Sequence, residues 1–451
     1  MVRRASVCIT MREPSPTRMK WFLSLTLSLF ILGGCSGSGG ESPPPKGDGG
    51  TNTPDGGPGN PDGGTGGSGC MSEALLASLG KNRLLVGAQM EERTAAGAPF
   101  DMRYLYVASG LVDSANVCMS CTTGCSTKGT SCSGGGCMWW GCWQDVSQPP
   151  GDYVRGFVSR SGDRQQIPFI TYYQQLLGSG IAEGEQQLQA LNDVAFMRRY
   201  FGDWRFTLQQ VGNARALLHI EPDLWGYIQF FSQGNPRTVA AQVASANATD
   251  CAGMTNDAAG LSRCMIAMAR KYAPNAKVGL HASPWATRID VYTNTNASFD
   301  VGAEARKVAD FLLALGAADT DFVVVEASDR DAGYYERQGE NTWWDTRNVT
   351  LPHFHQAFAW ARAVSERLNK PNFWWQLPVG NMSLPNSSTK WRDNRVDYFF
   401  THTAEVAGSH SAGFSFGAGN LEQTTPETDN GNLSNRMRAY RTAGGQVPCV
   451  Q

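Results

Sequence analysis

The stretch Ala216-Leu217-Leu218-His219-Ile220-Glu221-Pro222-Asp223-Leu224 decides the fold and the chemistry that this sequence predicts. Its first five residues are mostly apolar and indicate a buried strand. Pro222 ends that strand, because proline cannot donate a hydrogen bond to a sheet. Glu221 and Asp223 therefore stand at the carboxyl end of a strand, where parallel β/α barrels carry their catalytic groups. A structural interpretation is also open, since aspartate commonly caps the start of a helix.

Short apolar runs of this kind alternate with amphipathic helical stretches along the chain, which predicts βαβ units and a parallel sheet. We therefore expect an α/β fold, a parallel (β/α) barrel that is regular or distorted. An open doubly wound sheet is the alternative, although no Gly-x-Gly-x-x-Gly follows the first strand. The expected strands are 83–88, 102–107, 168–173, 216–220, 277–282, 322–327, 373–377 and 413–416, and the expected helices are 185–201, 258–272, 301–315 and 355–368.

The N-terminal region is typical of an exported protein. A basic start at Met19-Lys20 precedes a mostly apolar run that ends in Leu32-Gly33-Gly34-Cys35. This pattern resembles a bacterial lipoprotein signal, which makes Cys35 the lipidated first residue of the mature chain. A membrane-spanning anchor is the other interpretation, but the apolar run is shorter than the ~20 residues that a span needs. Lipid anchoring at the cell envelope, on the outer membrane or cell surface, is expected.

Composition separates a linker from a folded domain. Residues 36–69 are mostly Gly, Pro, Ser, Asp and Thr, which cannot build a core. We expect a signal segment at 1–34, a lipid-anchored flexible linker at 35–69, and a catalytic barrel domain at 70–451. The formal net charge is −2 and no long basic run occurs, so nucleic acid is not an expected partner. A monomer without cofactor or metal is expected.

The cysteines also favour an oxidising compartment. Of 12 cysteines, six lie between positions 118 and 142 in a Gly/Ser-rich context. Such spacing suits zinc inside cells, but disulfides are favoured after export, so we expect a disulfide-rich insertion. Cys251 and Cys264 are expected to pair locally, and Cys70 with Cys449 would join the ends of the domain.

Polar and aromatic residues stand at most of the expected strand ends, and a barrel would bring these ends to one mouth. Glu326 is the second candidate carboxylate after Asp223, because the apolar run Phe322-Val323-Val324-Val325 would leave it partly desolvated and so raise its pKa. A salt bridge to Arg330 is its structural alternative, and core packing is the alternative for each tryptophan. The expected substrate-binding residues are Tyr173, Trp225, His281, Trp285, Trp374, Trp375, Gln376 and His402.

The segment Leu217–Leu224 resembles the Glu-Pro-Asp signature of glycoside hydrolase family 6, the inverting cellobiohydrolases and endoglucanases. Residues 277–282 and 373–380 resemble that family's later strands. The resemblance implies a distorted parallel β/α barrel with Asp223 as proton donor to the leaving oxygen. The sequence departs from the family at three acidic positions, where Gln174-Gln175, His281 and Ser383 stand instead.

These observations predict a glycoside hydrolase that acts on a polysaccharide, inverting, with Asp223 as general acid. Glu221 would orient Asp223 or share its proton, and Glu326 would act as base. A retaining enzyme that uses Glu221 and Glu326 is the nearest alternative; carboxyl separations of ~5–5.5 Å indicate retention and ~6.5–9.5 Å inversion. A non-catalytic carbohydrate-binding lipoprotein on a hydrolase-like barrel, and a structural surface protein, are alternatives from other classes.

Overall fold

The computed structural model describes residues 70–120, 139–143, 149–420 and 422–448. Within these ranges, eight parallel strands pair in sequence order and close into a barrel, because β1 pairs with both β2 and β8. The predicted (β/α) barrel is confirmed, and the open doubly wound sheet is excluded. The strands are β1 Leu85–Ala88, β2 Met102–Val107, β3 Ile167–Tyr172, β4 Leu217–Ile220, β5 Lys277–Ala282, β6 Phe322–Glu326, β7 Asn372–Leu377 and β8 Ser411–Phe416.

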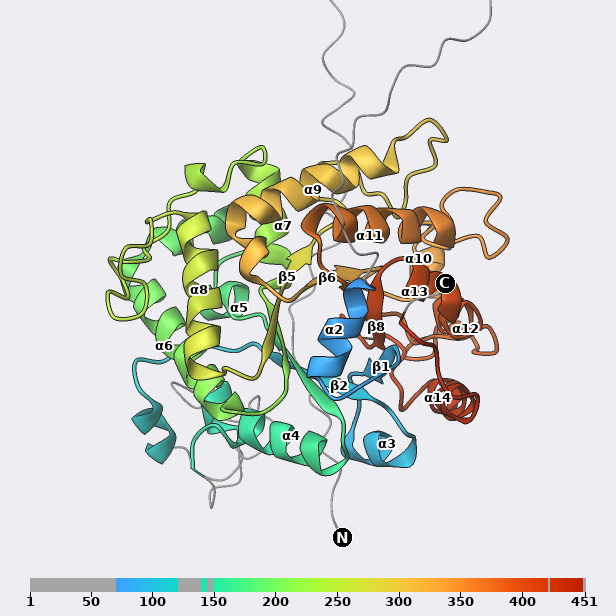
Figure 1. Ribbon diagram of the computed structural model, residues 1–451, viewed down its shortest axis with the longest axis horizontal. Helices are drawn as coiled ribbons and strands as arrows, with labels where there is room; N and C mark the ends of the chain where they lie inside the picture. Colours follow the sequence, from blue (N-terminus) through green and yellow to red (C-terminus); the bar gives the residue numbers. More distant parts are fainter. Residues whose placement is uncertain (1–69, 121–138, 144–148, 421, 449–451) are drawn as a thin grey trace, which may run out of the picture. The chain divides into compact units, whose positions relative to one another are not determined.

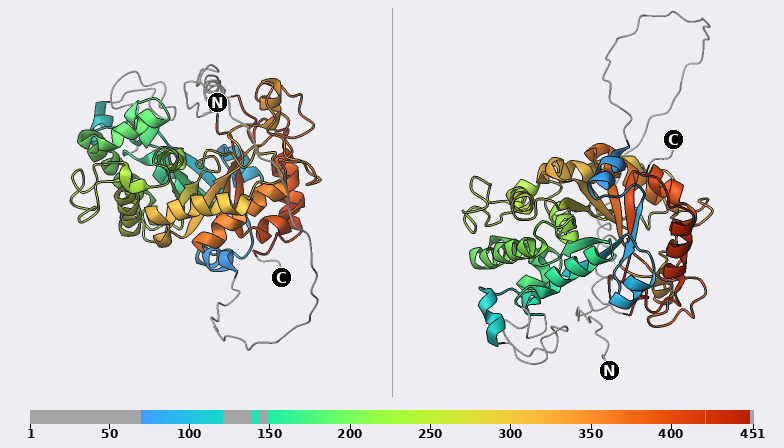
Figure 2. Two further views of the ribbon diagram at one scale, coloured as in Figure 1. Left: turned by 90° about the horizontal axis from the view of Figure 1, so that it is seen from above. Right: turned by 60° about the horizontal axis from the view of Figure 1, so that its bottom comes forward.

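Helices surround the barrel on its outside (Figures 1 and 2). Their apolar faces cover the outward side chains of the strands, which are almost all buried. The α-helices are α2 Met71–Ser78, α3 Glu92–Gly97, α4 Asp152–Asp163, α5 Gln175–Ser179, α6 Val194–Val211, α7 Pro222–Phe231, α8 Ala258–Tyr272, α9 Val301–Leu315, α10 Ala332–Arg337, α11 Phe354–Leu368, α12 Arg395–Thr401, α13 Thr403–Gly408 and α14 Asn432–Thr442. Short 3₁₀ helices are η1 Ala115–Ser120, η3 Trp140–Cys142, η4 Glu185–Asn192, η5 Pro236–Thr238 and η6 Ala317–Asp319.

One predicted helix is divided in two. The pattern at 185–201 indicated a single helix, but η4 ends before Asp193 and α6 begins after it. The Asp193 side chain accepts hydrogen bonds from the backbone N–H groups of Ala195 and Phe196, at 2.8 and 3.2 Å. An N-cap therefore starts a new helix inside a continuous apolar pattern.

The side chains inside the barrel change from apolar to polar between the end where the strands begin, here called the lower end, and the mouth, where the strands end. Phe169, Phe322 and Phe373 fill the lower part with edge-to-face contacts, and their ring centroids lie 5.2–6.2 Å apart. Gly279 lies beside them because a Cβ there would stand 2.2 Å from the Phe322 ring. Imidazole, indole and phenol rings come next, and carboxylates follow at the carboxyl ends of the strands. This gradient places the polar chemistry at one end of the barrel.

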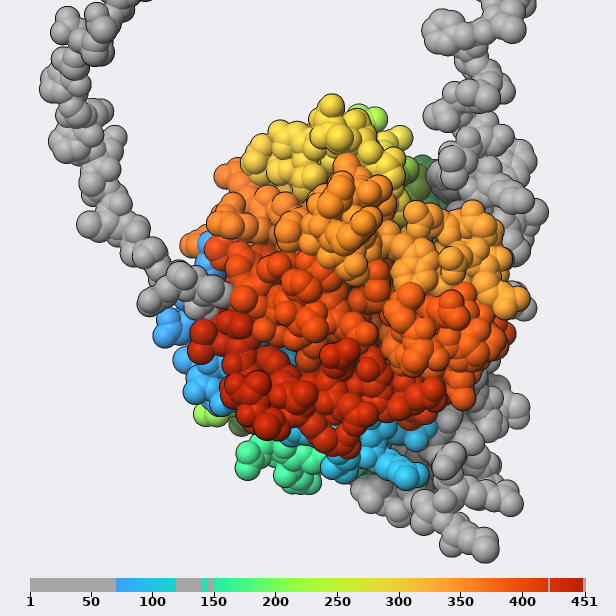
Figure 3. Space-filling view, turned by 90° about the vertical axis from the view of Figure 1, so that its right-hand side faces the viewer, coloured from blue at the N-terminus to red at the C-terminus, as the bar shows by residue number. Residues whose placement is uncertain are grey.

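The two ends of the described domain meet beside the seam between β1 and β8. Ser72 Oγ donates to the backbone oxygens of His410 and Ser411, at 3.2 and 3.1 Å. The Leu84 N–H donates to the Gln446 carbonyl at 2.9 Å. Figure 3 shows the first described residues, in blue, next to the C-terminal helices in red. The barrel is thus closed by contacts between segments more than 300 residues apart in the chain.

Two disulfides are described, Cys118–Cys142 and Cys251–Cys264. The second confirms the predicted local pair, and the first staples the two described ends of the expected disulfide-rich insertion. Cys70 is also disulfide-bonded, while its predicted partner Cys449 lies outside the described residues. Cys35, the signal segment and the linker lie outside them too. Among the residues that are described, no helix is long and apolar enough to cross a membrane.

Candidate active site

Asp223 lies where β4 passes into α7. Pro222 is the first residue of α7, so Asp223 falls in the first helical turn, as the helix-start interpretation expected. Its side chain is nevertheless directed into the barrel mouth, because it is hydrogen-bonded to Tyr173 and lies near the charges of Glu326 and Glu183. A helix N-terminus favours a charged carboxylate. Burial and those two neighbouring charges act against it and hold the pKa of the Asp223 carboxyl well above its usual range.

Five carboxylates, here called the mouth acids, interact electrostatically at the carboxyl ends of the strands. Asp223 lies near Glu326, and Asp290 and Asp329 lie near Glu326 as well. Burial and the charges of Glu326 and Asp329 raise the pKa of Asp290 to about 6. Such crowding of like charges forces some members to hold a proton at neutral pH. The mouth acids are Glu183, Asp223, Asp290, Glu326 and Asp329.

Glu326 ends β6 with its side chain 13% exposed. The predicted salt bridge to Arg330 does not form; Arg330 Nε instead lies 3.7 Å from Asp329 Oδ2, and its guanidinium stacks over Tyr334. The basic group beside Glu326 is His281, whose Nε2 lies 3.5 Å from Glu326 Oε1. Asp223 and Glu326 thus follow different strands and have different neighbours. Asp223 lies against a tyrosine and other carboxylates, whereas Glu326 lies against a histidine.

Tyrosines line the same space as the mouth acids. Tyr227 donates to Glu183 Oε1 at 3.0 Å, and the Tyr335 hydroxyl donates to Asp329 Oδ1. Tyr106 lies near Asp223, Glu326 and Asp329 and donates to Gln376 Oε1. Burial raises the pKa of Tyr106 and Tyr173 well above the usual phenol value. These phenols therefore remain protonated and act as hydrogen-bond donors around the acids.

Glu221 does not join the mouth acids, although only Pro222 separates it from Asp223. Its backbone is left-handed, with φ 48°, and its carboxylate is fully buried. Oε1 accepts from the N–H groups of Gln174 and Gln175 and from the Tyr200 hydroxyl of α6, at 2.8–3.1 Å. Burial raises its pKa to about 8. These contacts give Glu221 a structural role between β4 and α6, rather than the expected role of orienting Asp223.

Most of the tryptophans expected to bind sugar belong to the core. Trp225 and Trp374 are fully buried, and Trp374 packs among aromatic rings of α11 and α12. Trp375 is 2% exposed and packs edge-to-face against His219 and His281 below the acids. Only Trp285 of the four is partly exposed, and its ring contacts Tyr227 with centroids 4.8 Å apart. The alternative of core packing is therefore correct for three of them.

The remaining predicted binding residues divide between the mouth and the outer layer. Tyr173 hydrogen-bonds Asp223, and Gln376 lies against Tyr106 in the barrel interior. His402 is elsewhere, at the end of α12, where its ring stacks on Tyr398 with centroids 3.8 Å apart. It was misplaced because it precedes β8 in sequence, on the return path outside the barrel. His353, which precedes α11, caps that helix: its Nδ1 accepts from the Gln356 N–H at 3.0 Å.

Sequence reasoning missed several residues of the site. Glu183 and Asp290 come from loops without a recognisable pattern, and only the folded chain brings them to Asp223 and Glu326. His219 and Thr171 carried a weak signal, since each is a polar residue inside an apolar strand. Within the described ranges, no group of three His, Cys, Asp or Glu side chains is arranged to hold a metal ion.

A second acidic pair lies beneath the loops of the mouth. Asp331 and Asp393 are fully buried, and Asp331 accepts from the N–H groups of Gly380 and Thr424, both at 2.9 Å. Asp393 accepts from the Ala332 N–H at 2.7 Å and pairs with the buried Arg395 at 2.8 Å. The pair therefore ties together the loops that follow β6, β7 and β8. Burial and then the Asp393 charge raise the pKa of Asp331 to about 7.

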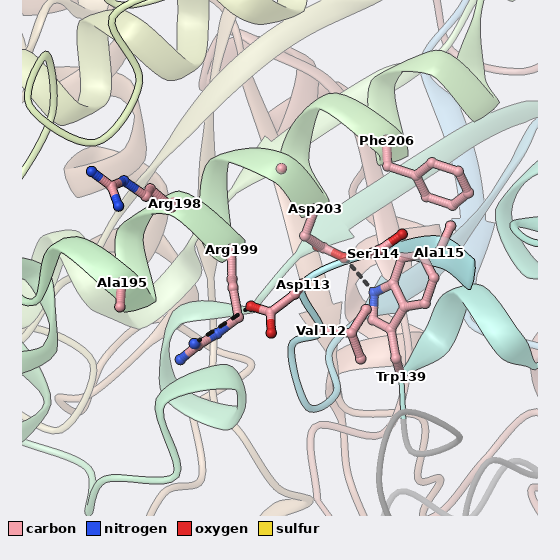
Figure 4. Close-up of a pocket in the computed structure, with 11 residues that line it drawn as sticks. Val112, Asp113, Ser114, Ala115, Trp139, Ala195, Arg198, Arg199, Asp203 and Phe206 are labelled. Atoms are coloured by element: carbon pink, nitrogen blue, oxygen red, sulfur yellow. Dashed lines mark hydrogen bonds and ion pairs between the residues drawn. The ribbon is translucent and has the colours of Figure 1, made fainter. Parts of the chain in front are cut away.

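A cavity of about 390 Å³ lies outside the barrel, between α6 and the described ends of the insertion. Figure 4 shows the Trp139 ring pointing at Asp203, with Nε1–Oδ1 at 2.6 Å. Asp203 also accepts from Trp140 Nε1 and the Tyr172 hydroxyl, at 2.7 and 2.9 Å. Asp203 thus anchors the end of the insertion to β3, and none of the mouth acids lines this cavity.

Comparison with known proteins gives likeness in structure only. No protein-family model matches the chain, and no curated protein matches its sequence. A modular endo-β-1,4-mannanase from Cellulomonas fimi, described with family 26 mannanases, matches with TM-score 0.44 and 9% identity over 83% of this chain and 74% of that one. A family 5 mannosidase mutant from Rhizomucor miehei matches with TM-score 0.42 and 11% identity, over 80% and 93%.

The resemblance to glycoside hydrolase family 6 is wrong. The endoglucanase Cel6 of Mycobacterium tuberculosis matches over only 53% of this chain and 62% of its own, with TM-score 0.29 and 11% identity. Structures that match most of the chain include family 26 and family 5 enzymes. The barrel here is closed by eight strands in sequence order. The resemblance to family 6 rested mainly on the short Glu-Pro-Asp segment, and the glutamate of that segment, Glu221, points away from the mouth toward α6.

Proposed function

We propose that this protein is a glycoside hydrolase whose proton donor is Asp223 and whose second carboxylate is Glu326. The observation that carries the proposal is the arrangement of these two groups in one mouth. Burial and the Glu326 charge hold the pKa of Asp223 well above its usual range, which favours the protonated form of Asp223. A protonated carboxyl opposite a second carboxylate is the pair that glycoside hydrolysis uses.

In this mechanism Asp223 donates its proton to the leaving glycosidic oxygen as the bond to the anomeric carbon breaks. Tyr173, which is hydrogen-bonded to Asp223, holds the carboxyl in place. Glu326 acts on the anomeric carbon, either through a water molecule or directly. The first gives inversion and the second retention of configuration. Glu221 is unsuited to either role, because its carboxyl hydrogen-bonds Tyr200 and lies on the α6 side of β4.

The mouth supports a neutral polysaccharide as substrate. The mouth acids would repel uronic acid residues, and among the described residues the one arginine paired with a mouth acid is Arg330, 3.7 Å from Asp329. Trp285 and Tyr227 offer aromatic faces, with ring centroids 4.8 Å apart, against which a sugar ring can stack. Mannans and galactans belong in the substrate panel, because the proteins of similar fold act on such polymers.

The experiment is reducing-end release from a panel of neutral and anionic polysaccharides. Asp223→Asn and Glu326→Gln should each lower the rate by about 10²–10⁴-fold while leaving polysaccharide binding intact. Asp113→Asn is the matched control, since Asp113 is an exposed acid that lines the cavity outside the barrel. Proton NMR of the first product gives its anomeric configuration and so the role of Glu326. A wild type that binds one polymer and cleaves none would establish the alternative, a non-catalytic carbohydrate-binding protein.

We also propose that Cys35 anchors the protein to the cell envelope through lipid, on the outer membrane or cell surface. The sequence Leu32-Gly33-Gly34-Cys35 and the polar linker after it support this. Wild-type protein should sediment with membranes and incorporate labelled palmitate, whereas Cys35→Ala should do neither. A Cys35→Ala variant that still sediments with membranes would contradict the anchor.

A further inference from the structure

A line of buried polar side chains leads from inside the barrel to Glu326. Thr171 Oγ1 lies 3.4 Å from His219 Nδ1, and His219 Nε2 lies 3.1 Å from His281 Nδ1. His281 Nε2 is buried, makes no hydrogen bond with any described residue, and has Glu326 Oε1 3.5 Å away. Thr171, His219 and His281 are each at most 1% exposed. Water therefore does not compete for these contacts.

The strand register explains how four successive strands build this line. Thr171 on β3 is level with His219 on β4, while His219 is level with Gly279 on β5. His281 is therefore two residues nearer the mouth than His219. His281 in turn is level with Val324, which places Glu326 two residues nearer still. Residues two apart share one face of a strand, so all four side chains can point inward.

The Trp375 ring closes this line against the barrel axis. Its centroid lies 4.8 Å from that of His219 and 5.8 Å from that of His281, both edge-to-face. Burial, and then the charge of His281, hold the pKa of His219 well below its usual value, so His219 is neutral. A neutral imidazole has one donor nitrogen and one acceptor nitrogen. Its hydrogen bonds must therefore run in a single direction.

We infer that Thr171, His219 and His281 form a one-way line of hydrogen-bond donors that ends beside Glu326 and is aimed at its carboxyl group. When each imidazole carries a single proton, the direction follows from the last contact, because a carboxylate can only accept and His281 Nε2 must then be the donor. His281 Nδ1 then accepts from His219 Nε2, and His219 Nδ1 accepts from the Thr171 hydroxyl. The reverse direction would place a nitrogen lone pair against the carboxylate. Thr171 and the two histidines are positioning residues, since none of them reaches the substrate.

This line explains why the acids of the mouth divide their roles as they do. Asp223 and Tyr227 of α7, Asp290 and Tyr292 after β5, Asp329 after β6 and Tyr106 of β2 all face Glu326. Glu326 differs from the other mouth acids in having an imidazole, that of His281, beside its carboxyl group. Asp223 has only the Tyr173 hydroxyl, and its protonated form is favoured. The inference rests on the proposed function for its catalytic meaning, but not for its geometry.

The test uses Thr171→Val, which removes the hydroxyl at the far end of the line and keeps the side-chain volume. The acidic limb of the kcat/KM profile should move up by roughly half a pH unit or more, because the ionised form of Glu326 loses support. Thr171→Ser should restore the wild-type limb. Thr207→Val, which removes the hydroxyl of another fully buried threonine, should leave the limb in place. A merely structural role for Thr171 would not move the limb.

Infrared titration makes the test independent of turnover. The carboxyl band of Glu326 is identified as the band that Glu326→Gln removes, and its midpoint is followed in wild type and in Thr171→Val. A midpoint raised in Thr171→Val supports the donor line even if no polysaccharide is cleaved, and in that case only the proposed function fails. An unmoved midpoint in a folded Thr171→Val protein overturns the inference, whatever the activity.

Discussion

The mouth acids and the pair Asp331 and Asp393 lie on the same side of the barrel but meet opposite surroundings. Each acid of the buried pair accepts hydrogen bonds from donors that surround it: the N–H groups of Gly380, Thr424 and Ala332, and the guanidinium of Arg395. The mouth acids mostly face one another and tyrosines. Only one residue, Arg330, separates Asp329 from Asp331 in sequence.

This difference shows how acids with similar positions acquire different roles. A buried carboxylate with its donors satisfied joins loops and contributes to stability. A carboxylate that faces like charges in a partly open mouth stores unfavourable energy, which a substrate or a transition state can relieve. The comparison predicts that substitutions in the pair affect stability, and that substitutions among the mouth acids affect turnover.

Asp393→Asn should give the largest loss of stability. It leaves the guanidinium of Arg395, which is fully buried, without its charged partner. Breaking a buried ion pair in this way costs about 3–5 kcal/mol. Urea unfolding measures the change, and the pKa of Asp331 should fall at the same time because a neighbouring charge is removed. If the free energy of unfolding fell by less than about 1 kcal/mol, the buried pair would not be a stabilising element that differs from the mouth acids.

Stability should depend on pH over a defined window. Buried acids have a raised pKa in the folded protein, about 6 for Asp203, about 7 for Asp331 and about 8 for Glu221. The unfolded chain releases these protons near pH 4, whereas the folded chain retains them to higher pH. The stabilising contribution is therefore complete at low pH and is lost as pH rises from about 4 to about 8.

Thermal unfolding across that window checks this expectation, and Glu221→Gln is the variant that isolates one group. Glutamine retains the acceptor for Tyr200 but cannot ionise. Glu221→Gln should therefore flatten the decline between about pH 6 and pH 8 and should match the wild type most closely at low pH. An unchanged slope would mean that Glu221 is ionised in the folded protein.

The sequence predicted the barrel well because its signals are local. All eight strands were located from short apolar runs, and the bounds predicted for α8 and α9 agree with the structure. Both helices begin at a capping aspartate, Asp257 and Asp300, whose side chain accepts a backbone N–H. Such caps and runs act over a few residues, so no knowledge of the tertiary fold is needed.

The site was predicted only in part, because side-chain direction depends on the folded backbone. Glu221 and Asp223 look equivalent in sequence, but the left-handed backbone at Glu221 sends its carboxylate to α6. Trp374 and Trp375 are neighbours on β7 and point to opposite sides of it, one into the outer core and one into the barrel. Glu183 reaches Asp223 from a distant loop, and no local pattern announces that contact.

Asp223→Asn should give the smallest change in stability and so provides the sharpest contrast with Asp393→Asn. Burial and the Glu326 charge raise the pKa of Asp223 and so favour its neutral form, and asparagine is nearly isosteric with that neutral acid. The free energy of unfolding should change by less than about 0.5 kcal/mol at pH 7, while hydrolysis falls by about 10²–10⁴-fold.

Above the pH at which Asp223 ionises, Asp223→Asn should become more stable than the wild type, because it removes one negative charge from beside Glu326 and Glu183. Urea unfolding at pH 7 and pH 9, with hydrolysis measured on the same preparations, separates the two effects. A loss of 2 kcal/mol or more at pH 7 would instead place Asp223 with Asp331 and Asp393, as an acid that the folded chain needs in order to hold its loops together.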